Sequence, residues 1–216
     1  MAKFEVGDKV KVKAGVWLID PNGSDPCELD IKGLSKYVFY PSWYPDGRKL
    51  AVVDYGHGVI KQIDIDKHTA RALTDPNKVL TGQPSVSPDG RTIALAGQLN
   101  RGQRYDQTEN RILLLDESGD LRELDPGQGR NPSWSPRGDW IAFRSNRGSE
   151  KGFYAIFIAS LQGGDPVQLT SYELHAHHPT WSPDGKYIAF AARLPDGNGS
   201  DGIAIVEVPT FKQKQE

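Results

Sequence analysis

The sequence predicts an all-β protein, a β-propeller built from four-stranded antiparallel blades. Three observations lead to this fold class: a repeated stretch of twelve residues, the turn chemistry inside it, and further strand segments that recur behind it. The stretch occurs four times, at residues 41–52, 84–95, 132–143 and 179–190, with spacings of 43, 48 and 47 residues. Short strands repeated at such a period are typical of propellers and solenoid arrays.

Each copy of the stretch is interpreted as a hairpin of the first two strands of a blade. In the last copy, the segment 182–185 reads Ser-Pro-Asp-Gly. Proline stands where a type I turn favours its fixed φ, and glycine stands where the backbone needs φ > 0. A short Pro-Thr-Trp segment precedes the turn and alternating residues follow it, so the turn joins two antiparallel strands. The tryptophan occurs in three copies, with Val86 in its place in the other, and its ring suits packing between neighbouring sheets.

Two more strands are predicted behind each hairpin. The third strand recurs as a short run of aliphatic residues, at 16–20, 60–64, 112–116, 155–159 and 203–207. A fourth strand follows a turn at 27–30, 71–74, 122–125 and 167–170. Four strands joined by short turns, with no helical periodicity between them, indicate all-β blades.

The number of blades depends on the first fifteen residues. The mean spacing predicts about five blades, four clear repeats plus a degenerate or shared N-terminal unit. Residues 1–15 are a degenerate first hairpin or a strand that closes the last blade. We favour the closing strand, because the polar tail 209–216 offers no fourth strand and an open ring exposes strand edges. The alternatives are an incomplete ring covered by a partner or another copy, and an unrelated small β module before a propeller at 16–208.

Composition excludes several classes of protein. Net charge is −2, from 26 basic and 28 acidic residues, so nothing favours binding to nucleic acid or an acidic membrane surface. The lone Cys27 excludes an internal disulfide. The first residues lack the apolar core of a signal peptide, and no apolar run approaches the ~20 residues of a membrane span. We therefore expect a soluble chain without membrane insertion, cytoplasmic as given, and periplasmic only if an export signal is missing.

The repeat resembles that of a known family. The run Pro-Ser-Trp-Ser-Pro-Asp-Gly-Lys followed by Ile-Ala-Phe, then a strand that ends in Asp, then Gln-Leu-Thr, resembles the TolB-like β-propeller repeat. It is also similar to the repeats in the propeller domains of prolyl oligopeptidase-type enzymes. The resemblance runs from about Val16 to Val208. It implies blades around a central channel, with the Pro-Ser-Trp strand innermost, and a non-catalytic protein that binds partner proteins at a channel mouth.

That resemblance directs attention to the residues that precede each proline. They are Tyr40, Gln83, Asn131 and His178, and they differ where the four copies otherwise agree. We expect them to ring one mouth of the channel and to bind a partner together with His175 and His177. The longest connection, residues 98–110, is a second candidate for docking through Arg101, Arg104 and Tyr105, because long loops on a rigid scaffold commonly carry function.

Two segments contain residues that bind metals. Glu173, His175 and His177 could converge on a divalent metal, whereas the simpler interpretation is a polar loop whose histidines meet solvent or a partner. Asp196, Asn198 and Ser200 have the spacing of a calcium loop, but the glycine of such a loop stands one place late and no helices flank it. A connection between strands is the simpler interpretation there. We therefore expect no cofactor.

Signatures of other enzymes are missing from the sequence. It has neither the Gly-x-Ser-x-Gly nucleophile elbow nor the Gly-x-x-x-x-Gly-Lys-Ser/Thr phosphate loop. Asp46, Asp89 and Asp184 occupy turn positions where aspartate is favoured for local backbone reasons. The main hypothesis is therefore a non-enzymatic propeller that binds a protein or peptide at its mouth and loops. The alternatives are a subunit whose open ring is completed by neighbours in an oligomer or larger assembly, and a small metal-dependent hydrolase or lyase that uses residues 175–178.

Overall fold

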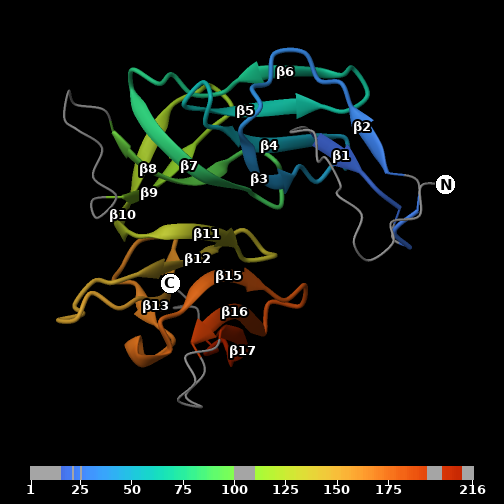
Figure 1. Ribbon diagram of the computed structural model, residues 1–216. Coiled ribbons are helices and arrows are strands. Elements are labelled where there is room, and N and C mark those ends of the chain that lie inside the picture. Colours follow the sequence, from blue (N-terminus) through green and yellow to red (C-terminus); the bar gives the residue numbers. More distant parts are fainter. Residues whose placement is uncertain (1–15, 21, 25, 100–109, 194–200, 211–216) are drawn as a thin grey trace.

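The computed structural model describes residues 16–20, 22–24, 26–99, 110–193 and 201–210. This part of the chain is all-β apart from one 3₁₀ turn (Figure 1). A two-stranded sheet comes first and pairs β1 (Val16–Leu18) with β2 (Cys27–Leu29). The first four-stranded sheet follows, with the order β3 (Val38–Trp43), β4 (Lys49–Asp54), β5 (Val59–Asp64) and β6 (Thr69–Ala72).

Three more sheets repeat this pattern. The second four-stranded sheet contains β7 (Val79–Val86), β8 (Ile93–Leu99), β9 (Arg111–Leu115) and β10 (Leu121–Gln128). The third contains β11 (Arg130–Trp134), β12 (Trp140–Ser145), β13 (Ala155–Ser160) and β14 (Val167–Gln168). The 3₁₀ turn η2 (Tyr172–Leu174) leads into the last sheet, which contains β15 (His177–Trp181), β16 (Tyr187–Arg193) and β17 (Asp201–Glu207). All pairs of neighbouring strands are antiparallel, which confirms the predicted blade.

The predicted hairpin turns are confirmed in detail. In the copy at 87–90 the amide of Gly90 donates to the carbonyl of Ser87 at 2.9 Å, and Gly90 has φ 75°. The side chain of Asp89 accepts from the Ser87 hydroxyl and from the Arg91 amide at 2.6 and 3.0 Å. Hydrogen bonds from these groups lower the pKa of Asp89. This aspartate is therefore held within its own turn.

Apolar residues form a separate core between each pair of adjacent sheets. The cluster between the first two four-stranded sheets contains Val53, Ile60, Leu95 and Leu113, which are fully buried. Equivalent clusters fill the spaces before and after it. Strand alternation explains this arrangement, because a strand with apolar residues on both faces packs against two neighbouring sheets.

A tryptophan on the innermost strand links each of the last two sheets to the one before it. The indole nitrogen of Trp134 donates to the carbonyl of Ser85 at 3.0 Å, and that of Trp181 donates to the carbonyl of Ser133 at 3.1 Å. Trp43 has the same position in the first four-stranded sheet but is 52% exposed, against 8% for Trp134. The predicted packing of the tryptophans between sheets is thus observed for Trp134 and Trp181.

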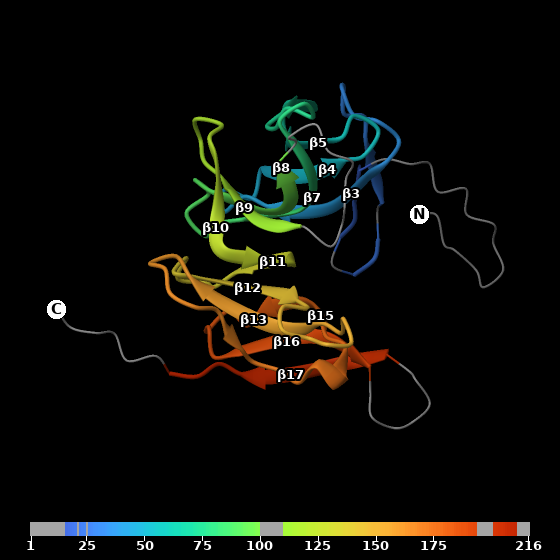
Figure 2. The ribbon, with the colours of Figure 1, turned by 90° about the vertical axis from the view of Figure 1, so that its left-hand side faces the viewer.

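The described sheets follow one another in an arc. The innermost strands of successive sheets contact each other, β3 with β7, β7 with β11, and β11 with β15. Figures 1 and 2 show β1 near one end of this series and β17 at the other. No sheet within the described residues closes the ring, so the number of blades is not decided. The prediction for residues 1–15 lies outside the described residues, as does the tail beyond Thr210.

Two local predictions need correction, and one element was missed. The strand β6 begins at Thr69, two residues before its predicted start, because the hairpin of β5 and β6 turns at residues 65–68. The innermost strands begin upstream of the prolines with which the repeated stretches start, so Tyr40 and its equivalents lie inside strands. The 3₁₀ turn η2 was not predicted. In the described residues, no helix has the length and hydrophobicity needed to cross a membrane.

Candidate functional site

The four residues before the prolines share one unusual backbone conformation. Tyr40, Gln83, Asn131 and His178 have φ of 55°, 46°, 53° and 51°, in the left-handed region. In each innermost strand the pairing register shifts at this point, which marks a β-bulge. A non-glycine residue in this region costs about 1–3 kcal/mol, and such strain concentrates at functional sites. Bulges also redirect side chains. The four positions are thus structurally equivalent, and their predicted role in binding stays a prediction.

Contacts connect the bulged residues of different sheets. The amide of Asn131 donates to the side-chain oxygen of Gln83 at 3.1 Å, across the boundary between the second and third four-stranded sheets. Asn131 is 7% exposed, whereas Tyr40 is 41% exposed and His178 is also exposed. The bulges thus gather at the same end of neighbouring innermost strands. We call the region of Tyr40, Gln83, Asn131 and His178 the mouth.

Arg144 on β12 is the charged centre of this region. The pKa of Arg144 is lowered overall. Burial and the positive charge of Arg130 lower it, and smaller opposing effects come from Tyr154 and Tyr40. The carbon of its guanidinium lies 4.6 Å from the centre of the Tyr154 ring. The influence of Tyr40, which belongs to a different sheet, places both residues within electrostatic range across the mouth.

The loop before β15 brings two of the predicted histidines together. The hydroxyl of Ser171 caps η2, and His175, with φ 45°, ends it. Nδ1 of His175 lies 3.3 Å from Nε2 of His177, and Arg144 Nη1 contacts His177 Nδ1. Arginine only donates, so His177 Nδ1 accepts and its Nε2 donates to His175. A chain of hydrogen bonds therefore runs from Arg144 through His177 to His175. The rings of Phe153 and Tyr154 lie 4.8 and 6.1 Å from that of His175.

This chain bears on the predicted metal site at Glu173, His175 and His177. Both nitrogens of His177 are engaged, as is Nδ1 of His175. Within the described residues, no group of three potential ligands has the arrangement that holds a metal ion. The side chain of Glu173 is exposed. In this arrangement the imidazoles act as hydrogen-bonding groups, and a metal would have to displace Arg144 from His177.

The other predicted site residues fall outside the described part of the chain. These are Arg101, Arg104 and Tyr105 of the long connection, and Asp196, Asn198 and Ser200 of the calcium-like loop. Their predicted roles stay predictions.

Sequence reasoning missed Arg144. A signal was present, because Arg144 stands where the other three repeats have Val53, Ala96 and Ala191. One charged residue in an otherwise apolar column of a repeat marks a position with a different task. Tyr154, whose ring lies under the Arg144 guanidinium, follows a glycine-containing turn, and the sequence gives no comparable signal for it.

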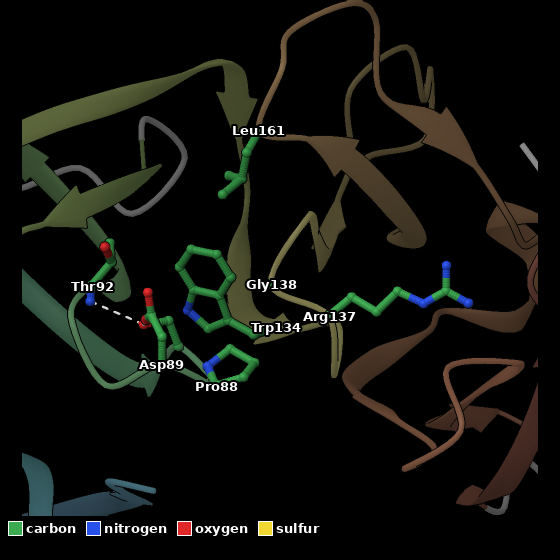
Figure 3. A pocket seen from close by; sticks show the side chains of 8 residues that line it. Pro88, Asp89, Thr92, Trp134, Arg137, Gly138 and Leu161 are labelled. Atoms are coloured by element: carbon green, nitrogen blue, oxygen red, sulfur yellow. Dashed lines mark hydrogen bonds between the residues drawn. The ribbon is translucent and has the colours of Figure 1, made fainter. Parts of the chain in front are cut away.

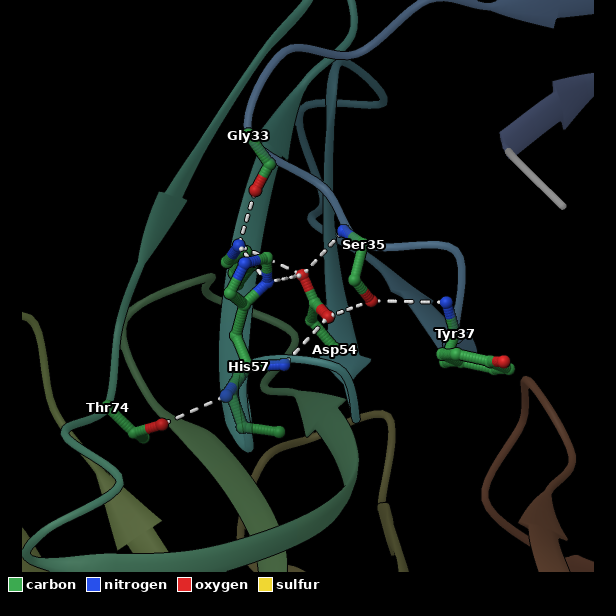
Figure 4. A network of polar contacts seen from close by, with 8 residues as sticks. Gly33, Ser35, Tyr37, Asp54, His57 and Thr74 are labelled. Atoms are coloured by element: carbon green, nitrogen blue, oxygen red, sulfur yellow. Dashed lines mark hydrogen bonds and ion pairs between the residues drawn. The ribbon is translucent and has the colours of Figure 1, made fainter.

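A buried network around Asp54 was also missed (Figure 4). The side chain of Asp54 is fully buried and binds Lys61 Nζ at 2.9 Å and His57 Nδ1 at 2.8 Å. The amide of Ser35 donates to Asp54 at 3.1 Å, and the Ser35 hydroxyl also donates to it. Burial alone would raise the pKa of Asp54, but the bonds from Ser35, Lys61 and His57 outweigh it and hold the pKa far below its usual range. The bonds from Ser35 to Asp54 and from Lys61 Nζ to the carbonyl of Gly33 fix the segment 33–37 against β4 and β5, which is a structural role.

A pocket of about 330 Å³ lies at the other end of the strands (Figure 3). The turn of the second four-stranded sheet, with Ser87 and Asp89, forms one side, and Trp134, Arg137 and Leu161 form the other. The Arg137 side chain extends away from Asp89 in Figure 3. Within this pocket Asp89 is bonded to groups of its own turn.

Comparisons with known proteins agree with this architecture. A family model described as a TolB β-propeller domain matches residues 9–215. The uncharacterized peptidase YuxL of Bacillus subtilis is 30% identical, over 49% of this chain and 21% of that protein. This chain therefore spans about a fifth of that relative.

Solved structures show the same fold at low identity. TolB from Acinetobacter baumannii has a TM-score of 0.71 and 24% identity, covering 88% of this chain and 45% of that one. An oligogalacturonate lyase from Vibrio parahaemolyticus has a TM-score of 0.64 and 15% identity, covering 88% of this chain and 55% of the lyase. The chain thus spans about half the length of these structures. At these identities they establish the fold alone, and they include proteins named for different activities.

Proposed function

This chain belongs to the TolB β-propeller domain family, and from that premise we propose that it is a non-enzymatic scaffold that binds a protein or peptide through its mouth. The observation that carries the proposal is the set of four bulged residues with left-handed backbone. Tyr40, Gln83, Asn131 and His178 occupy the same strained place in each sheet, yet none is glycine. Glycine would remove the strain, so a side chain at these positions has a use that offsets its cost.

The surroundings of the mouth support recognition of a partner. Rigid sheets hold its residues, so binding orders few side chains and loses little entropy. Tyrosine, histidine, asparagine and glutamine combine apolar surface with hydrogen-bonding groups, a composition suited to protein and peptide surfaces. The exposed rings of Phe39 and Tyr40 add apolar area, with 49% and 41% exposed.

The test is a comparison of partners captured by three forms of the protein from native extract. The double variant Tyr40→Gly/His178→Gly removes two mouth side chains and relieves backbone strain, so it should remain folded. His68→Gly is the matched control, because His68 also has left-handed backbone, with φ 53°, but lies in the turn between β5 and β6. We expect a partner that the wild type and the control capture and the double variant loses.

Two outcomes would contradict the proposal. Capture of the same partners by all three forms would show that the binding site lies outside the mouth. Absence of any captured partner, with folded protein confirmed by circular dichroism, would count against a binding scaffold altogether.

A second candidate function is an assembly in which copies complete one another's sheets. Trp43 is exposed at one end of the arc, although Trp134 and Trp181 bond to a serine of the preceding sheet. At the other end, Thr180 stands where Ser133 accepts such a bond, beside exposed Ile203 and Ile205. The surface with Trp43 and the surface with Thr180 therefore correspond to the two sides of the contact between neighbouring sheets within the molecule. The mass in solution, measured by light scattering, distinguishes a monomer from a defined oligomer.

A further inference from the structure

Arg144 lacks the negative partner that a half-buried guanidinium usually has. Among the described residues, no carboxylate lies within ion-pair distance of it, and its buried Nε has no hydrogen-bond partner. The contacts that it does make are with rings, at 4.6 Å from the Tyr154 centre and at His177 Nδ1. A half-buried charge without a counter-charge is costly. The guanidinium is thus positioned but not neutralised.

The surroundings of Arg144 add positive charge instead of removing it. Arg130 lies directly opposite Arg144 across β11 and β12, and its charge lowers the pKa of Arg144. His178 also faces this group, and burial and the charge of Arg144 lower the His178 pKa. His178 is therefore neutral at pH 7. An anion that approached this point would be attracted by the guanidinium of Arg144.

A second unpartnered polar atom belongs to the strand β11, which pairs with the strand of Arg144. Asn131 is 93% buried, and its Oδ1 accepts no hydrogen bond, although its amide donates to Gln83. It follows Arg130, the residue opposite Arg144. Buried polar atoms in proteins are nearly always paired. The unpaired Oδ1 of Asn131 and the unpaired Nε of Arg144 therefore leave the interior of the mouth short of hydrogen bonds.

An exposed aromatic surface borders the mouth on β3 and the turn that follows β4. The ring of Phe39 lies 6.3 Å from that of Tyr40 and 5.7 Å from that of Tyr55. All three are between 41% and 50% exposed. Tyr40 is also the residue whose influence reaches Arg144. Apolar area and an unneutralised charge therefore occur at the same end of the molecule.

We propose that the mouth binds an acidic peptide, with the carboxylate held by Arg144 and an apolar neighbour packed on Phe39 and Tyr40. This inference rests on the proposed function and adds the chemistry of the ligand. Of the three guanidinium nitrogens, Nη1 contacts His177 and Nε is buried, which leaves Nη2 to donate to a carboxylate. A peptide supplies the apolar side chain together with the carboxylate.

The test uses three blocked peptides that differ in one side chain, and one peptide with a free C-terminus. The probes are acetyl-Gly-Phe-X-Phe-Gly-amide, with X as Glu, Gln or Lys, and acetyl-Gly-Phe-Gly-Phe with a free terminal carboxylate. Binding is measured by NMR titration of ¹⁵N-labelled protein. We expect the Glu peptide to bind about tenfold more tightly than the Gln peptide, with shifts at Asn131 and Tyr40, and more weakly as salt is raised. The terminal carboxylate peptide shows whether side-chain or terminal carboxylates are preferred.

Protein variants locate the preference. Arg144→Gln should bind the Glu and Gln peptides alike, and Arg144→Lys should keep only part of the preference, because lysine retains the charge but not the fork. Arg137→Gln removes an exposed arginine from the other end of the same sheet and should bind as the wild type does. The comparison of Glu with Gln peptides needs no variant, so poor folding of Arg144→Gln would leave the test intact.

The outcomes separate this inference from the function on which it rests. Equal binding of Glu and Gln peptides at the mouth overturns the carboxylate site but leaves a peptide-binding mouth. A preference for Glu that persists in a folded Arg144→Gln variant places the carboxylate elsewhere and overturns the inference. No shift at the mouth with any probe, together with a partner whose capture is unaffected by Tyr40→Gly/His178→Gly, rejects both.

Discussion

At the scale of single residues, the repeat assigns one task to each position and then departs from it at a few. The tryptophan of the innermost strand joins sheets, and the aspartate of the turn binds its own backbone. Arg144 and Asp54 have no counterparts of the same type in the other repeats. Arg144 has no counter-charge, which makes it a candidate binding group. Asp54 has several hydrogen-bonding and charged partners, which gives it a structural role.

The tryptophan bond can be tested with a pair of matched substitutions. Trp134→Phe removes the bond to Ser85 and part of a buried ring, so we expect a loss of about 1–2 kcal/mol in the free energy of unfolding. Trp43→Phe changes a ring that is 52% exposed and should change stability by less than about 0.5 kcal/mol. Urea unfolding measures both. Equal losses would mean that the bond between sheets contributes nothing.

The Asp54 network predicts a dependence of stability on pH. The folded pKa of Asp54 is below its unfolded value of about 3.9, so its stabilisation is present above about pH 5 and is lost as pH falls through 4. Asp54→Asn leaves Lys61 without its partner and should cost about 3 kcal/mol at pH 7. Urea unfolding between pH 3 and 7 should therefore show a smaller loss on acidification in the variant. The control Asp184→Asn alters an exposed turn carboxylate and should keep most of the wild-type slope.

The histidine pair predicts a weak response to metals. His177 uses both nitrogens and His175 uses Nδ1 in the chain from Arg144, so a divalent ion has few free ligands there. We expect 1 mM zinc or manganese to raise the melting temperature by less than about 2 °C. A larger rise that His177→Ala abolishes would show a metal site and would favour the enzymatic alternative.

At the scale of elements, burial differs between sheets that have two neighbours and sheets at the ends of the arc. The strand β8 is buried along almost its whole length, because sheets cover both of its faces. In β17 exposed and half-buried residues alternate, so one face is covered and the other presents Ile203 and Ile205, at 75% and 69% exposure. The same aliphatic third strand of the repeat therefore has two environments.

This exposed face predicts self-association. Ile205→Lys places a charge on the uncovered face of β17 without touching the core, so folding should be retained. If copies complete one another's sheets, the wild type should gain mass with concentration and the variant should stay monomeric, as measured by light scattering. Equal masses for both proteins at every concentration would reject this surface as the contact.

At the scale of the whole molecule, stability should be distributed along the arc. In arrays of repeats each unit contacts only its neighbours, so stability is approximately a sum over units and interfaces. Hydrogen exchange should be slowest in β8 and β9, which lie between two cores, and fastest in β1 and β2, which form a two-stranded sheet. Uniform protection across all sheets would instead indicate that the arc unfolds as one unit.

The sequence by itself determined the class of fold and most of its elements. Turn chemistry is local, since Ser-Pro-Asp-Gly sets its own backbone angles, and the fixed period repeats that chemistry at each blade. The equivalence of Tyr40, Gln83, Asn131 and His178 followed from the same alignment of repeats, and all four have the same left-handed backbone. These features depend on residues close together in the chain.

Only the tertiary structure decided which residues meet. Arg144 lies beside His177, 33 positions later, and within range of Tyr40 in another sheet. Ser35 and Lys61 come from either side of Asp54 to neutralise it. Such contacts depend on how sheets stack and on where bulges point side chains, and no period in the sequence encodes these. The same reason explains why the repeats predicted blades but not an arc whose end faces remain exposed.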